Sequence, residues 1–141
     1  MNTNINDSGI VIGAGRTERA IAIDVVREFL DALGRRDLEA ARAYLAPGFT
    51  MTVSGNHRFR SLPEFAAFSA SRNGPARKHI DGLEACEAPI GVAVYASGTM
   101  SGHWLDGTAF QGVRYCDRFV LREGLIHDLQ VWSDMAEFRP R

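Results

Sequence analysis

The stretch VRYCDRFVLREGLIHDLQV, residues 113–131, decides the fold. Apolar and polar side chains alternate on both sides of Arg122-Glu123-Gly124, which is typical of two strands joined by a turn. A three-residue loop with glycine in the left-handed position would pair Asp117 with Leu129. The stretch therefore predicts a β-hairpin with one apolar face, and Asp117 is the charged residue on that face.

A second turn, at Asp106-Gly107, extends the predicted sheet toward the N-terminus. Asp-Gly favours a two-residue primed turn, which would pair Gly98 with Tyr115 and Ala96 with Asp117. One face of the sheet then carries Val92, Val94, Ala96, Gly98, Met100, Val113, Tyr115, Asp117, Phe119, Leu129 and Val131. Because two independent turns give one apolar face, and a slip of one residue would scramble it, we expect this face to lie toward the helices.

A loop over residues 87–90 would add the preceding strand to the sheet. With four residues in this loop, His79 pairs with Gly98 and lies on the apolar face, in the row next to Asp117. On the other neighbouring strand, His127 lies diagonal to Asp117, a relation that corresponds to about 7–8 Å between Cα atoms. The register therefore predicts two histidines near one buried carboxylate.

The first half of the chain carries three helix-capping signals. They predict helices that begin after Thr17, Asp37 and Ser61, the first running to about Leu33 and the second through Leu45. Alternation over residues 49–54 predicts a strand between the second helix and the third. Helices gathered before strands indicate an α+β domain, with three helices packed on a curved, mainly antiparallel sheet.

This domain is predicted to cover residues 17–141. Residues 1–16 are rich in Asn, Gly and Ser, and we expect them to form a flexible N-terminal arm. The whole chain has 141 residues, which suits one domain better than two.

The composition argues against several classes of protein. A net charge of -1 leaves no excess of basic residues for nucleic acid or for an anionic membrane surface. The start lacks a signal-peptide pattern, and no apolar run approaches the roughly 20 residues that span a bilayer. Cys86 and Cys116 are too few for a disulfide framework. We therefore expect two buried thiols and a cytoplasmic protein.

Asp117 is the predicted catalytic residue. Burying an unpaired carboxylate costs on the order of several kcal/mol, so Asp117 needs a partner, a proton or water in a cavity. The small residues Ala96 and Gly98 predict such a cavity, suited to a small apolar or aromatic ligand. A carboxylate there has a raised pKa and can shuttle a proton near neutral pH. The alternative is a structural carboxylate paired with an arginine or a backbone N–H.

Three further side chains are predicted to act with Asp117. His79 or His127 would carry protons, and Tyr115 would hydrogen-bond a substrate carbonyl. The apolar wall of the cavity would consist of Phe29, Met51, Val53, Phe65 and Met100. Both histidines also have a structural interpretation, His79 at a strand end and His127 beside a turn.

No metal and no cofactor are expected. The four histidines have no ligand spacing and join no cysteine pair. Residues 9–15, GIVIGAG, are similar to a dinucleotide fingerprint. The third glycine position is Glu18, however, and its carboxylate would repel the phosphate.

Large aromatic side chains on the outer face of the predicted sheet indicate a partner surface. Trp132 lies there with Ile126, and Tyr95 lies there with Ala93. We expect a homodimer through this face, and the alternative is ordinary scattered exposure.

Five segments carry a wider resemblance: EFLDAL (28–33), DLEAA (37–41), GFTM (48–51), KHIDG (78–82) and the final hairpin over 115–134. With these segments the chain resembles the nuclear-transport-factor-2-like superfamily, and within it the SnoaL-like polyketide cyclases. The resemblance covers about residues 17–138. It implies a cone-shaped α+β barrel with a conical pocket and, commonly, a homodimer through the outer sheet face.

The chain departs from three enzyme classes that share this fold. A ketosteroid isomerase would have an Asp near Val53, and a limonene-epoxide-hydrolase-like site would have Arg and Asp near Gly98 and Met100. Of a scytalone-dehydratase-like site, only the histidine that corresponds to His79 is present. A SnoaL-like acid/base pair, Asp117 with His79 or His127, agrees with the resemblance.

Two functions follow from these residues. The first is a cofactor-free small-molecule enzyme of cyclase, isomerase or dehydratase type, in which Asp117 moves a proton next to a carbonyl. The second is a non-catalytic small-ligand-binding or dimerisation module of the same fold. A raised pKa of Asp117 in a roomy pocket would favour the enzyme, and an ordinary pKa in a surface salt bridge would favour the module.

Overall fold

The computed structural model describes residues 11–12 and 16–140. Its elements in chain order are β1 (Val11–Ile12), β2 (Arg16–Thr17), α1 (Glu18–Gly34), α2 (Leu38–Arg42), β3 (Leu45–Val53), β4 (His57–Phe59), α3 (Leu62–Ala70), β5 (Arg77–Glu87), β6 (Val92–His103), β7 (Ala109–Arg122), β8 (Leu125–Ser133) and the 3-10 turn η1 (Met135–Phe138). The predicted order of three helices around one strand, followed by four strands, is confirmed, and β4 is an additional short strand.

Most of the predicted flexible arm, residues 1–10 and 13–15, lies outside the described residues. The same holds for most of the glycine-rich segment over residues 9–15. The described part of the arm is paired, because Val11 lies opposite Thr17 and Ile12 lies opposite Arg16.

The three predicted capping residues all cap helices. The side chains of Thr17, Asp37 and Ser61 accept hydrogen bonds from the backbone N–H three residues later. The second helix is shorter than predicted, because α2 ends at Arg42 and Leu45 already pairs with β8. A strand contact with β8, which is distant in the sequence, therefore overrides the helical spacing at this point.

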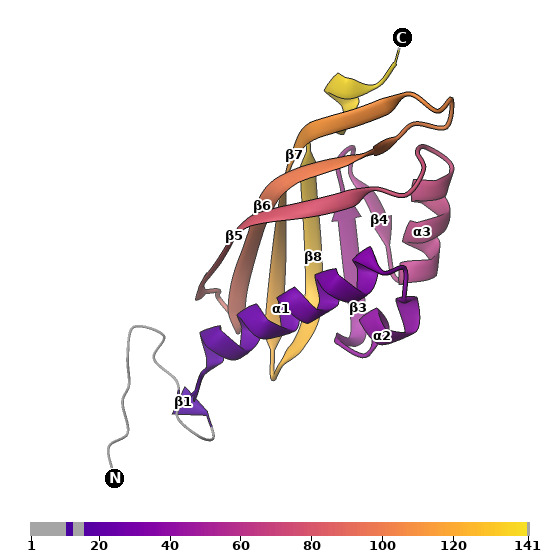
Figure 1. Cartoon of the computed structure of the whole chain (residues 1–141). Coiled ribbons are helices and arrows are strands. Elements are labelled where there is room, and N and C mark those ends of the chain that lie inside the picture. Colours follow the sequence, from indigo (N-terminus) through magenta and orange to yellow (C-terminus); the bar gives the residue numbers. More distant parts are fainter. Residues whose placement is uncertain (1–10, 13–15, 141) are drawn as a thin grey trace.

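The larger sheet has the strand order β4-β3-β8-β7-β6-β5 and is antiparallel except for the β3–β8 pair. Figure 1 shows α1 lying across one face of this curved sheet, with α3 beside β4 at one end. The predicted α+β cone, three helices on a mainly antiparallel sheet, is therefore confirmed. None of the helices in the described part of the chain combines the length and the apolarity needed to cross a bilayer.

The β6–β7 register is as predicted where the site lies, although the turn differs. Ala96 lies opposite Asp117, and Gly98 lies opposite Tyr115. The predicted two-residue turn is wrong, because the last pair before the turn is His103 with Ala109. The register shifts by one residue between the Gly102–Phe110 and Met100–Val113 pairs, near Gly112 with its φ of +72°. Beyond this shift the two strands have the predicted alignment.

The predicted β7–β8 register is wrong by two residues. Asp117 lies opposite Val131, and the turn consists of Glu123 and Gly124, which both have positive φ. A bulge at His127 then shifts the ladder, so that the apolar face of β7 and β8 is retained. The bulge also turns Ile126 into the core, and the prediction of Ile126 on the outer face is wrong.

The predicted β5–β6 register is wrong by two residues next to the loop, where Leu83 and not Asp81 lies opposite Ala96. In the N-terminal half of β5 it is wrong by one residue, and this exchanges the two faces there. The ladder shifts at Asp81, so that Ile80 lies opposite Gly98. His79 consequently lies opposite Thr99 of the outer face, and Lys78 lies opposite Met100 of the inner face. A lysine therefore occupies the side of the strand that was predicted for a histidine.

The inner face and the helices enclose the core. The buried residues of the predicted face include Val92, Val94, Ala96, Met100, Val113, Tyr115, Asp117, Phe119 and Leu129. Gly98 has a separate role, because β5 approaches it closely at the bulge. An ideal Cβ on Gly98 would lie 1.9 Å from the backbone oxygen of His79.

Replacing Gly98 by Ala should destabilise the fold by about 3 kcal/mol, the upper end of overpacking costs, because the obstacle is backbone. Urea unfolding measures this change. Gly34→Ala is the matched control, because no atom lies within 4 Å of its ideal Cβ. We expect the control to be neutral or to gain up to about 1 kcal/mol. Equal stability of the two variants would contradict the close approach at Gly98.

Candidate functional site

Asp117 of β7 and Lys78 of β5 form an ion pair on the inner face of the sheet. Lys78 Nζ lies 2.6 Å from Asp117 Oδ2. The Asp117 side chain is 0% exposed, whereas the Lys78 side chain is 28% exposed. The predicted inward direction of Asp117 is confirmed, and its partner is a lysine where a histidine was predicted.

The small residues of β6 make this pair possible. Because β6 lies between β5 and β7, the side chain of Lys78 must pass over it to reach Asp117. Lys78 lies in the row of Met100 and Asp117 in the row of Ala96, and between these rows β6 carries Gly98. The room that Ala96 and Gly98 were expected to leave for a ligand is therefore needed for the lysine.

The ion pair lies where the apolar core divides in two. On β7, Phe119 belongs to the main cluster and Tyr115 to a second cluster, with Asp117 between them. On β6, Ala96 belongs to the main cluster and Met100 to the second cluster. The polar pair therefore occupies the boundary between two apolar regions, where few polar groups compete for its charges.

Burial and an unpaired oxygen both destabilise the ionised form of the Asp117 carboxyl group. Burial raises the pKa of Asp117, and the Lys78 ammonium opposes that rise. Its second oxygen, Oδ1, is buried and has no hydrogen-bond partner among the described residues. A buried acceptor without a donor costs about 1–3 kcal/mol. Oδ1 is therefore the position where a proton or a polar ligand atom would be stabilised.

Tyr115 forms the apolar side of this site. The Lys78 ammonium lies 4.5 Å from the centre of the Tyr115 ring, within cation–π range. The hydroxyl group donates a hydrogen bond of 3.3 Å to the backbone oxygen of His79. Burial, followed by the nearby Asp117 charge, raises the pKa of Tyr115, so its hydroxyl stays neutral. Tyr115 thus holds the ammonium by its ring, and its hydroxyl is already engaged.

The structure does not bring the two predicted histidines to Asp117. His79 is on the outer side, where its Nε2 lies 3.2 Å from Asp81 and its side chain is 77% exposed. His127 lies at the β8 bulge, with its Nδ1 3.0 Å from Arg122. Both displacements have the same cause, a bulge that changes the register.

The five predicted wall residues do not share one cavity. Phe29 packs edge-on against Phe119, with ring centres 5.8 Å apart, and Met51 is buried in the same main cluster. Val53 and Phe65 are partly buried against that cluster, whereas Met100 belongs to the second one.

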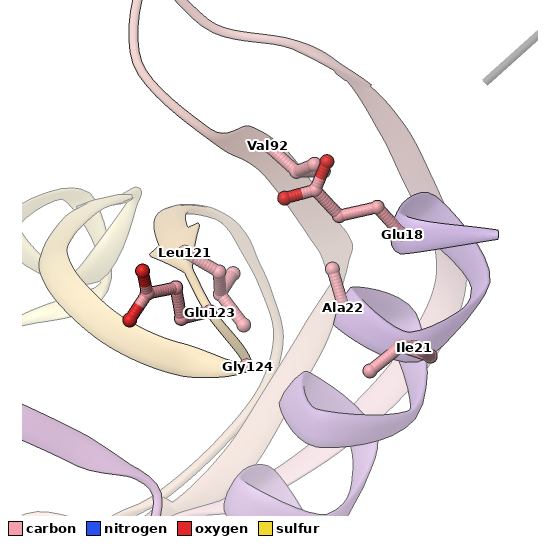
Figure 2. A pocket seen from close by; sticks show the side chains of 7 residues that line it. All are labelled: Glu18, Ile21, Ala22, Val92, Leu121, Glu123 and Gly124. Carbon is pink, nitrogen blue, oxygen red and sulfur yellow. The ribbon is translucent and has the colours of Figure 1, made fainter. Parts of the chain in front are cut away.

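Asp117 lines neither of two hollows on the described surface. The first, of 290 Å³, lies between the start of α1 and the β7–β8 turn (Figure 2). It is lined by Glu18, Ile21, Ala22, Val92, Leu121, Glu123 and Gly124. The second, of 220 Å³, is lined by residues 52–56 and 130–132. Because Asp117 is covered and Lys78 is partly exposed, a ligand would approach Asp117 past Lys78.

The described residues give little support for metal binding or for thiol chemistry. In the part of the chain that is described, no three His, Cys, Asp or Glu side chains gather as a metal ion requires. Burial, followed by the Asp117 and Glu84 charges, raises the pKa of the Cys116 thiol, which keeps it protonated. Cys86 is exposed and Cys116 is half-buried, so the prediction of two buried thiols is wrong for Cys86 and only partly right for Cys116.

A signal for Lys78 was present in the composition. The chain has sixteen basic residues, and Lys78 is the single lysine among them. Lysine can deliver a point charge on a flexible stem, whereas arginine presents a wide planar fork. A lone lysine in a chain rich in arginine indicates a position with special requirements, although its direction depends on the bulge at Asp81.

The cone-like fold is shared with solved structures. An NTF2-like protein of unknown function from Burkholderia pseudomallei K96243 is 22% identical with a TM-score of 0.69, over 84% of this chain and 94% of that one. TerC, co-crystallized with polyporic acid, is 17% identical with a TM-score of 0.71, over 84% and 95%. A protein assigned as a polyketide cyclase from Xanthomonas campestris pv. campestris is 19% identical with a TM-score of 0.69, over 86% and 96%. The fold is therefore that of the NTF2-like class.

Residues 26–129 match the family model of the SnoaL-like domain. Because this match spans well over half of the 141 residues, the chain belongs to the SnoaL-like domain family, as its resemblance predicts. The comparison with curated proteins gave no significant match.

Replacing Lys78 by Met should leave the Asp117 carboxylate buried without its cation. We expect a loss of about 3 kcal/mol at about pH 8, the lower end for a broken buried pair, because Lys78 is 28% exposed. The double variant Lys78→Met, Asp117→Leu removes both charges and should recover most of this loss. Urea unfolding of the single and double variants measures both steps.

The pH dependence of the Lys78→Met loss provides the control. Because the pKa of Asp117 is raised in the folded protein, the folded chain binds a proton over a pH range in which the unfolded chain has lost it. Lowering the pH through that range stabilises the folded state, and more so without the opposing lysine. The gap between the single and the double variant should therefore narrow from about pH 8 to about pH 5. A gap that is independent of pH would contradict a buried carboxylate.

Proposed function

We propose that this protein is a small-molecule enzyme of cyclase, isomerase or dehydratase type, which moves a proton next to a carbonyl group without a cofactor. The observation that carries the proposal is the Lys78–Asp117 pair, in which a carboxylate with a raised pKa lies 2.6 Å from the only lysine. Such a pair supplies a proton acceptor and a cation in one apolar place.

The two residues would have different tasks. The Lys78 ammonium would bind the carbonyl oxygen and stabilise the negative charge that develops on it. Asp117 would remove the proton from the neighbouring carbon and return it at another position. Because Asp117 is covered, the substrate would displace the flexible Lys78 stem from Oδ2 and would meet Oδ1, which has no partner among the described residues. His79 and His127 have no part in this proposal, since neither lies near the pair.

The family supports an apolar substrate. The chain belongs to the SnoaL-like domain family, and a structural neighbour from Xanthomonas campestris pv. campestris is assigned as a polyketide cyclase. Another neighbour, TerC, was co-crystallized with polyporic acid. The surroundings of the pair, the ring of Tyr115 and the side chain of Met100, agree with a small apolar or aromatic ketone.

The first step of this chemistry can be tested without the natural substrate. The protein should speed the exchange of α-hydrogens for deuterium in enolisable ketones, with 4-phenylcyclohexanone and steroid-like or aromatic polyketide-like ketones as probes, followed by NMR. Asp117→Asn should reduce the enzymatic rate by about 10²–10⁴-fold, the usual contribution of a general acid or base.

His103→Gln is the matched control, because His103 lies at the exposed end of β6, away from the pair. It should exchange at the wild-type rate. Circular dichroism confirms that each variant is folded. If Asp117→Asn is folded and exchanges as fast as the wild type, the proposal fails.

The second candidate function is a dimerisation or ligand-binding module, and the outer face of the sheet favours it. Two large aromatic side chains, Trp132 and Tyr95, are 49% and 38% exposed there. The buried ion pair on the inner face is compatible with such a module, because a buried pair can be purely structural. A homodimer through this face is compatible with either function. Of the predicted neighbours of these aromatics, Ile126 and Ala93 are buried instead, which makes the outer patch smaller than expected.

Trp132→Glu should convert the proposed dimer into a monomer, because it places a charge in the centre of the contact. Analytical ultracentrifugation of wild type and variant measures this. Leu105→Glu makes the same kind of change at the exposed β6–β7 turn and should leave the dimer intact. A wild-type protein that sediments as a monomer would end the dimer proposal.

A further inference from the structure

We infer that Lys78 acts as a covalent group, forming an imine with the carbonyl carbon of the substrate at the inner face of β5. This inference rests on the proposed function and names its substrate class, which is apolar aldehydes and unhindered ketones. Esters and amides are excluded, because their carbonyl carbon does not form an imine.

The contacts of Lys78 place a proton acceptor directly against its amino group. The ammonium lies 4.5 Å from the centre of the Tyr115 ring and 2.6 Å from Asp117 Oδ2, and its stem runs over the small residues of β6. A lysine attacks a carbonyl carbon as the free amine, so its proton must first pass to an acceptor. Asp117 is that acceptor, because it is in direct contact with the ammonium and burial raises the pKa of its carboxyl group.

The exchange of atoms is balanced without a further reactant. The Lys78 ammonium gives one proton to Asp117, and the free amine attacks the carbonyl carbon, so that a C–N bond forms and the C=O electrons move to oxygen. A proton passes from nitrogen to that oxygen through the Asp117 carboxyl. Asp117 then gives its own proton to the hydroxyl, which leaves as water. The products are a cationic imine, one water molecule and the original carboxylate.

The product suits the site as well as the ammonium does. The imine nitrogen retains one positive charge, so the ion pair with Asp117 persists and no buried charge loses its partner. The iminium group also draws electrons from the neighbouring carbon, which makes its proton easier for Asp117 to remove. Oδ1, buried and without a partner among the described residues, is the atom that can accept that proton.

The single lysine makes a sharp trapping experiment possible. The wild-type protein is incubated with 4-phenylcyclohexanone and sodium cyanoborohydride, which reduces an imine to a stable secondary amine. Peptide mapping by mass spectrometry should find one adduct, at Lys78, which is the only lysine in the chain. The α-amino group is resolved by its own peptide. Trapped protein should lose the deuterium exchange in proportion to the adduct.

Two controls separate folded chemistry from simple amine reactivity. Lys78→Arg keeps a cation beside Asp117 but stays protonated, so the variant, once circular dichroism shows that it is folded, should give no adduct and lose exchange at least about 100-fold. The wild-type chain unfolded in guanidinium chloride should be labelled at Lys78 at least about tenfold more slowly, because Asp117 is no longer held against the amino group.

The outcomes distinguish this inference from the proposal beneath it. Exchange by the wild type without any adduct at Lys78 would overturn the imine and leave proton transfer by the ion pair standing. Full exchange by Lys78→Arg would also overturn it. If the wild type neither exchanges α-hydrogens nor is trapped with the panel of ketones, the proposed function itself fails. Equal labelling of folded and unfolded protein would assign the adduct to ordinary lysine reactivity and overturn the inference.

Discussion

A buried carboxylate that must keep a cation within reach constrains the inner face of this protein. Asp117 is held by Lys78 across an intervening strand, and the neighbouring residues follow from that contact. Small residues on β6 leave a path for the lysine stem, the Tyr115 ring covers the ammonium, and the bulge at Asp81 turns Lys78 inward. Removing either charge would leave the other uncompensated, so these features depend on one another.

The helices and the faces of the last strands could be predicted from local signals. Thr17, Asp37 and Ser61 cap helices because a side-chain oxygen near a free backbone N–H is a short-range interaction. The apolar face of β6 and β7 is also right, although the turn between them is not two residues long. A register shift near Gly112 compensates for the longer turn, so the alignment of Ala96 with Asp117 is preserved.

The candidate site was predictable only in part. Alternation places Asp117 inward, because that depends on its own strand. Its partner depends on the register of β5, and the bulge there lies beside a contact between distant parts of the chain, the close approach of the His79 backbone to Gly98. Sequence patterns do not record such contacts, so a histidine was expected where Lys78 lies. The same limit applies to His127, which a second bulge moves away from Asp117.

The unpaired position at Asp81 decides which groups of this strand face the core. Side chains alternate with a period of two, so pairing Asp81 into the ladder would shift the residues between it and the start of β5 by one position and exchange their faces. The imidazole would then face the interior, and the amine would face solvent, although no amino acid had been substituted. Deleting the unpaired residue would not have this effect, because Lys78 would stay opposite Met100 and Ile80 opposite Gly98. One strand sequence thus has two interiors with different acid–base groups, and the presence or absence of a bulge selects between them.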